Sequence, residues 1–191
     1  MTAARRRFLD EGFERTSMES ISEAAGVTKR TLYRKYPDKL SLLNAVLAWP
    51  GAVLPFPTIA LNERWDLAKN LARVTDSLLA WILEDDMLRM GRLSTEVQSL
   101  VDHEALGSRN ALYLEKVLNS VRDALLLDRP EWGVEQVDFF AGAFLCMVAQ
   151  PMYVEALEGR RPPGYNEGDK ALVLRYIDLF INGWKGRTDF P

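Results

Sequence analysis

Residues 16 to 43 constrain the fold of this chain more than any other segment, because they carry the pattern of two short helices joined by a tight turn. Thr16 and Ser17 are residue types that cap helices, and an apolar face at helical spacing follows them. Gly26 then stands where the turn needs a residue that tolerates a positive φ. We expect four side chains to form the core of this segment and to hold its geometry: Ile21, Ala25, Val27 and Leu32.

A second, basic helix is expected directly after this turn. Thr28 is a cap-type residue, and residues 29–36 place four cations around Leu32, after which Pro37 and Asp38 open a third helix. A short helix rich in Arg and Lys suits the major groove of DNA, where these side chains read guanine edges and neutralise phosphate. The pattern therefore indicates a helix-turn-helix that binds DNA. Its cations are Lys29, Arg30, Arg34 and Lys35.

The distribution of charge agrees with this interpretation. The chain of 191 residues has a net charge of −3, yet residues 1–48 hold nine Lys and Arg against six Asp and Glu, a net +3. The remaining residues therefore carry −6. A basic head on an acidic body directs one end of the molecule toward a polyanion, although any solvated surface shows fluctuations of this kind.

The segment resembles the DNA-binding end of the TetR family of bacterial transcriptional regulators. The resembling positions cover about a quarter of the chain and are Gly12, Phe13, Thr16, Ser17, Met18, Ile21, Ala24, Ala25, Gly26, Val27, Thr31, Leu32, Tyr33, Tyr36, Lys39 and Leu42. One departure lies at the start, where Arg5 and Arg7 fall at positions expected to be apolar. Either the first helix is frayed, or the natural chain begins upstream of Met1.

The resemblance implies roles for individual positions. Lys29, Arg30 and Thr31 open the recognition helix, whose side chains reach base edges, and Tyr33 resembles the tyrosine whose hydroxyl binds a phosphate. A bidentate contact from Arg30 to guanine is worth about 1–3 kcal/mol of discrimination. Thr31 is equally well explained as a capping residue. The predicted DNA-binding residues are Thr16, Ser17, Thr28, Lys29, Arg30, Thr31, Tyr33, Arg34, Lys35 and Lys39.

The whole chain is predicted to be all-α, with an N-terminal three-helix head and a C-terminal helical bundle. Residues 1–48 form the helix-turn-helix head, residues 49–60 a connection with three prolines, and residues 61–191 a helical domain for regulation and dimerisation. Apolar residues at helical spacing predict five helices in this last part. They cover about 62–84 (with Trp65 in its apolar stripe), 86–99, 102 to before Pro130, 133–158 and 169–184.

The fourth of these body helices is apolar on nearly all sides, so it must be buried on more than one side. Either it lies at the centre of one large bundle, or a second copy of the chain covers its outer side. The TetR resemblance favours a homodimer formed through the last two helices. A two-fold dimer presents two recognition helices about 34–36 Å apart, which predicts an inverted-repeat operator.

The resemblance also implies a pocket in each subunit whose small-molecule effector releases the protein from DNA. Bulky apolar residues and a few polar groups predict a largely apolar or aromatic ligand, although such residues at helical spacing also form plain cores. The predicted ligand-binding residues are Trp81, Met87, Met90, His103, Tyr113, Phe144, Met147 and Gln150. The alternative is a DNA-bound adaptor or activator whose body binds a protein partner instead of a small ligand.

Enzymatic and membrane functions find little support in the sequence. With one histidine and one cysteine, no metal cluster of these ligands is possible, and no catalytic motif or cofactor is predicted. Cys146 lies in an apolar run, which predicts a buried, inert thiol. The longest apolar run, residues 139–149, is too short to cross a bilayer, and no charged-then-apolar leader opens the chain. We therefore expect a soluble, cytoplasmic protein.

Overall fold

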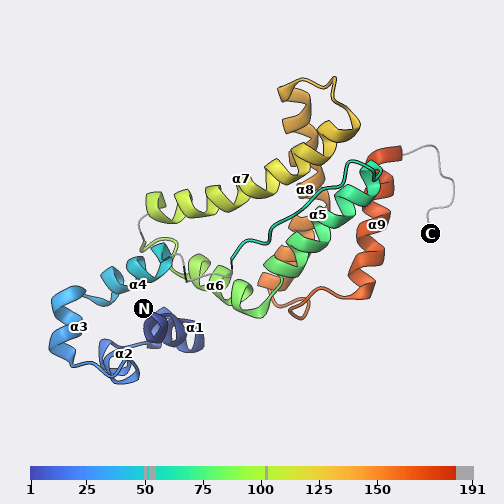
Figure 1. The fold of residues 1–191 in the computed structure, drawn as a ribbon. Helices are drawn as coiled ribbons and strands as arrows, with labels where there is room; N and C mark the ends of the chain where they lie inside the picture. The colour runs from blue at the N-terminus through green and yellow to red at the C-terminus, as the bar shows by residue number, and fades with distance from the viewer. Residues whose placement is uncertain (50, 52–54, 102, 184–191) are drawn as a thin grey trace. The chain divides into compact units, whose positions relative to one another are not determined.

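The computed structural model describes residues 1–49, 51, 55–101 and 103–183, with the backbone alone for residues 103–114. This part of the chain contains nine α-helices and no β-strand (Figure 1). The predicted all-α fold, with an N-terminal helix-turn-helix and a C-terminal helical domain, is confirmed. The helices are α1 (Thr2–Arg15), α2 (Met18–Ala24), α3 (Lys29–Lys35), α4 (Lys39–Ala48), α5 (Leu67–Ile82), α6 (Asp85–Glu96), α7 (His103–Asp128), α8 (Val134–Leu157) and α9 (Glu167–Asn182).

The chain divides into two compact units. Unit 1 comprises residues 1–55 and 85–112, and unit 2 comprises residues 56–84 and 113–191. Helix α6 thus belongs to the same unit as the first four helices, whereas the sequence-based division assigns it to the body. That division into functional domains stays a prediction, because compactness alone does not define a functional boundary.

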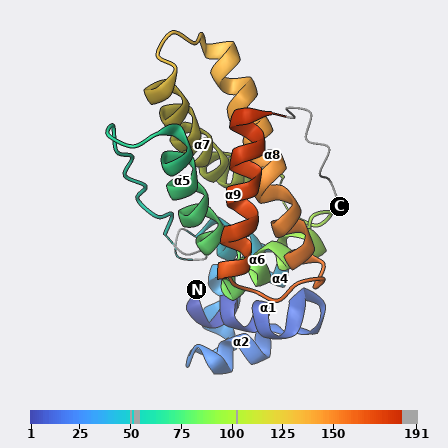
Figure 2. The same ribbon diagram turned by 90° about the vertical axis from the view of Figure 1, so that its right-hand side faces the viewer.

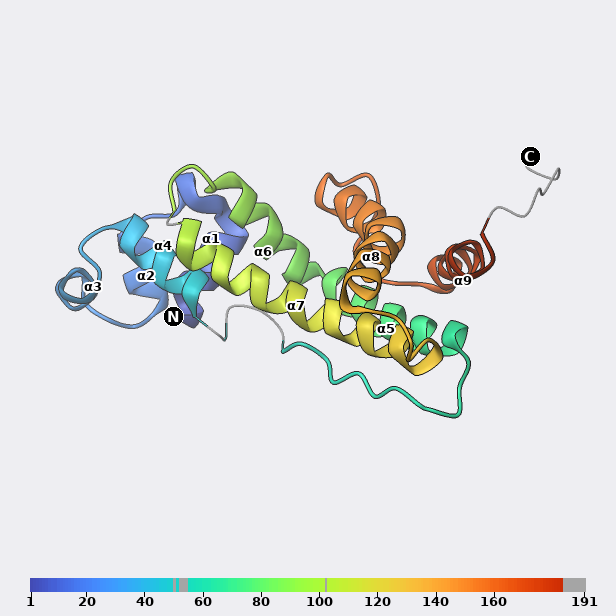
Figure 3. The ribbon, with the colours of Figure 1, turned by 90° about the horizontal axis from the view of Figure 1, so that it is seen from above.

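Unit 1 is built around α1, which packs against α2, α4 and α6 (Figure 3). Helix α4 buries a continuous stripe, because its apolar residues recur at helical spacing. Each fully buried side chain of this size contributes roughly 1.5–3 kcal/mol relative to exposure. The largest buried side chains of the unit are Phe8, Ile21, Leu42, Leu43, Val46 and Leu88.

Ion pairs account for the arginines that the first helix carries at positions expected to be apolar. Helix α1 begins at Thr2, and the guanidinium of Arg5 lies 3.0 Å from the carboxylate of Asp86 on α6. The side chain of Arg5 is only 17% exposed, while Arg7 pairs with Glu11 one turn further along. A frayed helix is therefore not what the structure shows, since the arginine at the apolar position contacts an acidic partner on a neighbouring helix.

Unit 2 is formed by α5, α8 and α9, which pack side by side, together with the second part of α7 (Figure 2). Helix α5 begins after Asp66, whose carboxylate accepts a hydrogen bond from the backbone N–H of Lys69 at 2.8 Å. The prediction that this helix starts near residue 62 and carries Trp65 in its apolar stripe is wrong. Trp65 precedes the cap and is 43% exposed, because Asp66 ends the non-helical segment.

The loop between α8 and α9 is fastened to α5. The hydroxyl of Tyr165 donates to Asp76 at 2.6 Å, and the N–H of Gly164 donates to the carbonyl oxygen of Leu83 at 2.8 Å. Burial and the neighbouring carboxylate of Asp76 together raise the pKa of Tyr165. These contacts fix where α9 starts relative to α5 within unit 2.

Helix α8 has one buried side and one exposed side. Phe144 is fully buried, whereas Phe139 is 70% exposed. By length and composition α8 is apolar enough to cross a membrane, a property shared with core helices of soluble proteins, and here it packs against α5 and α9. The predicted burial of Cys146 is wrong, because this thiol lies on the exposed side of the helix.

Candidate nucleic-acid interface

The turn between α2 and α3 is held by capping at both helix starts. Ser17 accepts a hydrogen bond from the N–H of Ser20 at 3.0 Å, and the hydroxyl of Ser20 lies 3.4 Å from the N–H of Ser17, which completes a capping box. Gly26 has φ +65°, the left-handed conformation that the tight turn requires. Thr28 then accepts from the N–H of Thr31 at 3.2 Å and starts α3.

The predicted core of this motif is half correct. Ile21 and Leu32 are 1% and 8% exposed, so both are core residues as predicted. Ala25 is exposed and Val27 is 40% exposed, so these two predictions are wrong. The reason is the shortness of α3, which has seven residues and buries Leu32 alone, leaving the outer corner of the turn uncovered.

Helix α3 lies at one edge of unit 1 (Figure 1). Arg30 and Arg34 are exposed, and among the described residues no carboxylate pairs with either. Lys35 is also exposed, with its ammonium 5.5 Å from the ring centre of Tyr36. Tyr33 is 44% exposed, so its hydroxyl is available to solvent or to a bound phosphate.

Lys29 differs from the other cations of α3 because it has an acidic partner. Its ammonium lies 2.8 Å from a carboxylate oxygen of Glu19 on α2. The hydrogen bond from Lys29 lowers the pKa of Glu19, and the same contact raises the pKa of Lys29. Sequence analysis did not identify Glu19 as part of this site, since its first-turn position on α2 is explained equally well by the helix dipole.

Thr16 and Lys39 contact the protein itself. Thr16 is 2% exposed, and its hydroxyl lies 2.7 Å from the carbonyl oxygen of Gly12. The ammonium of Lys39 donates to the carbonyl oxygens of Phe13 at 2.7 Å and Glu14 at 3.1 Å, at the end of α1. In this conformation both side chains connect α1 to the helices that follow, and their contacts with DNA stay a prediction.

The predicted ligand-binding residues are divided between the two units. Trp81, Phe144, Met147 and Gln150 belong to unit 2, and Met87 and Met90 belong to unit 1. The side chains of His103 and Tyr113 lie outside the described residues.

Within unit 2 the predicted residues do not share one environment. Trp81 is half-buried against Phe56, with ring centres 5.3 Å apart, and Phe144 is fully buried against Phe180. Gln150 is exposed, so it lies on a different side of α8 from Phe144. Among the described residues, no group of three or more His, Cys, Asp or Glu is placed to hold a metal ion.

Comparison with known proteins points to one family. Residues 1–46 match the sequence model of the family described as bacterial regulatory proteins, tetR family. An uncharacterised HTH-type transcriptional regulator of Mycobacterium bovis is 28% identical over 116 residues, and a protein with the same description from Mycobacterium tuberculosis matches equally. The match covers 60% of this chain and 59% of each relative, so the chain spans less than two thirds of the length of these relatives.

Solved structures share the fold over nearly the whole chain. A TetR transcriptional regulator from Agrobacterium tumefaciens has a TM-score of 0.74 at 18% identity, covering 95% of this chain and 90% of that one. A TetR-family regulator from Mesorhizobium loti has a TM-score of 0.60 at 21% identity, covering 96% and 91%. NalD, the secondary repressor of the MexAB-OprM multidrug efflux pump in Pseudomonas aeruginosa, has a TM-score of 0.54 at 19% identity, covering 95% and 91%. At these identities the likeness shows the fold alone.

Proposed function

We propose that this chain, whose residues 1–46 match the model of the bacterial regulatory proteins of the tetR family as the resemblance predicts, regulates transcription by binding an operator in DNA. The single observation that carries the proposal is the geometry of the turn before α3. Gly26 at φ +65° and the cap at Thr28 present a short helix whose arginines have no acidic partner among the described residues. Such a helix is suited to the major groove.

The residues proposed to contact DNA fall into two groups. Arg30 and Thr31, near the start of α3, read base edges, with Arg30 making the bidentate contact to guanine. The remaining groups bind phosphate and set the register of the helix in the groove. They are Ser17, Thr28, Tyr33, Arg34 and Lys35, and Lys29 joins them when its pair with Glu19 is broken. Thr16 and Lys39 are proposed to position α2 and α4, because their polar atoms are engaged within unit 1.

We propose that two copies of the chain associate through α8 and α9 and bind an inverted repeat. The proposal rests on the apolar side chains that these helices leave exposed: Val134 (77%), Phe139 (70%), Leu174 (56%), Leu179 (40%), Ile181 (40%) and Leu172 (39%). Large apolar side chains left exposed on two neighbouring helices are candidates for a subunit interface, because association would remove them from water.

The dimer interface has a direct test with a matched control. Phe139→Asp on α8 is expected to convert the dimer to a monomer in sedimentation velocity measurements, because it buries a charge in the interface. Leu127→Asp on α7, also at an exposed leucine (44%), should leave the dimer intact. Equal sedimentation of both variants would contradict the proposed interface.

We propose that the protein is a cytoplasmic repressor and that a largely apolar small molecule releases it from DNA. The alternative is an adaptor or activator whose body binds a protein partner. Of the residues predicted to bind the effector, Trp81, Phe144 and Met147 lie in unit 2 and are half-buried or buried. A thermal shift screen of apolar and aromatic compounds, combined with loss of DNA binding, separates the two functions.

The DNA-binding proposal is tested by fluorescence anisotropy on duplexes tiled across the DNA that flanks the coding region. We expect tight, competitor-resistant binding to one tile that contains an inverted repeat. Arg30→Ala should weaken this binding far more than binding to random duplex, whereas Arg129→Ala in unit 2 should change neither. Equal losses on both duplexes for Arg30→Ala would remove the base-reading assignment.

A further inference from the structure

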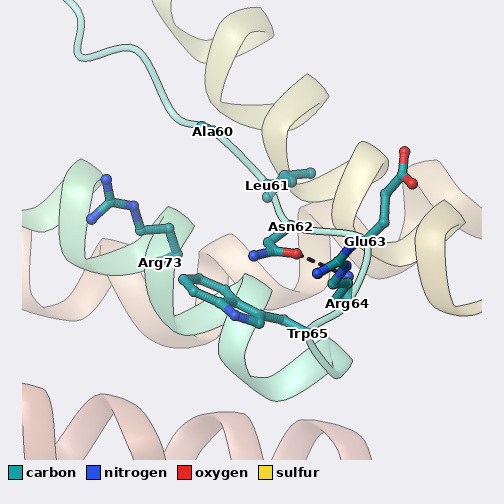
Figure 4. A pocket seen from close by; sticks show the side chains of 7 residues that line it. All are labelled: Ala60, Leu61, Asn62, Glu63, Arg64, Trp65 and Arg73. Atoms are coloured by element: carbon teal, nitrogen blue, oxygen red, sulfur yellow. Dashed lines mark hydrogen bonds between the residues drawn. The ribbon is translucent and has the colours of Figure 1, made fainter.

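A cavity that is largely open to solvent lies at the surface of unit 2, between the first turns of α5 and the segment that precedes this helix (Figure 4). Its volume is about 660 Å³, within the range of sites that hold small molecules. It is lined from the segment by Ala60, Leu61, Asn62, Glu63, Arg64 and Trp65, and from α5 by Arg73. None of the residues predicted from the sequence to bind a ligand contributes to this lining.

The wall of the cavity is held in place by a buried amide. Asn70 on α5 is 1% exposed, which is costly for a polar side chain unless it is hydrogen-bonded. Its oxygen accepts from the N–H of Asn62 at 3.0 Å, and its nitrogen donates to the carbonyl oxygens of Asn62 at 3.1 Å and Trp65 at 3.4 Å. The segment before α5 is therefore preorganised by the helix, and the cavity is a built feature of unit 2.

The lining combines an aromatic face with positive charge. Trp65 is 43% exposed, so part of its indole is free to stack with another ring. Arg64 and Arg73 are also exposed, and no carboxylate of the described residues pairs with either. In the view of Figure 4, Arg73 and the amide nitrogen of Asn62 lie on the same side of the indole, and the carboxylate of Glu63 points away.

We propose that this cavity binds a small planar aromatic carboxylate. The ring of the ligand stacks on Trp65, and its carboxylate accepts hydrogen bonds from the guanidinium of Arg73, whose planar fork matches a carboxylate. The amide of Asn62 adds a donor, and Arg64 adds positive charge elsewhere in the lining. A cationic ligand would be repelled by the two guanidinium groups, and a purely apolar ligand would desolvate them without compensation.

The bound ligand would contact both the segment that precedes α5 and the second turn of α5 itself. The chain connects these two parts only through Asp66 and the start of the helix. Trp65 and Arg64 lie on the segment that leads from residue 56 to α5, and Arg73 lies two turns into the helix. Occupancy would therefore restrain the segment through which the chain passes from unit 1 into α5. Ligand binding at this site can be measured without DNA. Its failure can therefore be distinguished from a failure of the DNA-binding proposal.

The test uses the full chain and a matched pair of probes in isothermal titration calorimetry. 2-Naphthoate is expected to bind with a dissociation constant below about 1 mM, as suits a ligand of this size in an open site. The neutral 2-naphthamide has nearly the same shape and should bind about tenfold more weakly, because it cannot form a charge-assisted pair. Equal affinities for the two probes, or no binding of 2-naphthoate at millimolar concentration, would overturn the proposal.

Variants locate the site. Arg73→Gln and Trp65→Ala should each weaken 2-naphthoate binding about tenfold, and Trp65→Phe should retain most of the affinity because it keeps an aromatic face. Lys69→Gln removes a positive charge from the same helix outside the lining and should leave binding unchanged. Unaltered binding in both Arg73→Gln and Trp65→Ala, with wild-type circular dichroism, would assign the probe to another site and refute the inference.

Discussion

Replacing Glu19 by Gln should strengthen DNA binding, although Glu19 was not among the residues predicted to contact DNA. Its carboxylate lies 2.8 Å from the ammonium of Lys29, the first residue of α3. The pair sits beside the groups proposed to contact phosphate, so the wild-type carboxylate both neutralises Lys29 and repels the DNA backbone. The isosteric Gln removes the negative charge and leaves Lys29 free to bind a phosphate.

The size of the effect follows from counterion release. Each phosphate neutralised contributes about 0.9 to the slope of log affinity against log salt concentration. One additional phosphate contact therefore strengthens binding about eightfold at 0.1 M salt, and the gain changes by roughly 3.5-fold between 0.05 M and 0.2 M salt. The gain should be similar on operator and random duplex, because a phosphate contact carries no sequence information.

Fluorescence anisotropy titrations at three or more salt concentrations measure both the affinity and the slope. Two controls isolate the contact. Glu158→Gln removes a carboxylate paired with Arg160 in unit 2 and should change the slope little, and in a Lys29→Gln background the Glu19 substitution should add no phosphate contact. If Glu19→Gln leaves the slope unchanged, or if Glu158→Gln raises the affinity equally, Lys29 does not meet a phosphate and the proposed orientation of α3 is wrong.

Three further expectations concern stability. Gly26→Ala should lower the free energy of unfolding by about 1 kcal/mol in urea titrations, because the left-handed backbone is strained for alanine while no atom lies within 4 Å of the added Cβ. Tyr165→Phe should cost about 1 kcal/mol in the same assay through loss of the 2.6 Å hydrogen bond to Asp76, and an unchanged urea midpoint would contradict this role. Arg89 on α6 holds the pKa of Asp10 below its usual value, so the stability from this pair is present above about pH 4 and lost as pH falls through the folded pKa. The urea midpoint should therefore drop between pH 5 and 3 by less in Arg89→Gln than in the wild type, and parallel curves would count against the pair.

Local signals in the sequence were sufficient for the helix-turn-helix. The caps at Ser17 and Thr28 and the positive φ at Gly26 are each encoded within four residues, so pattern alone predicts them. The start of α5 had the same kind of signal in Asp66, and giving that cap more weight than the apolar spacing would have excluded Trp65 from the helix.

Contacts between distant residues could not be predicted in this way. Arg5 and Asp86 are 81 residues apart, and Arg89 and Asp10 are 79 apart, so no periodicity links them. The presence of arginine where an apolar residue was expected was itself a signal, since a half-buried guanidinium needs a partner. The sequence-based interpretations, a frayed helix or a start upstream of Met1, included neither the ion pair of Arg5 nor the helix that supplies its partner.

Helix α8 illustrates a different limit, because periodicity reports which sides of a helix are apolar and says nothing of what covers them. Its sequence is apolar on nearly all sides, yet within one chain Phe144 is buried while Phe139 is 70% exposed and Cys146 lies in solvent. Apolar side chains left uncovered in this way favour association, since burying each one gains roughly 1.5–3 kcal/mol. The error in predicting a buried Cys146 and the proposal of a dimer thus have one origin. A thiol on the surface that two copies are proposed to share becomes buried on association, so alkylation of Cys146 should be slower in the dimer than in the Phe139→Asp monomer.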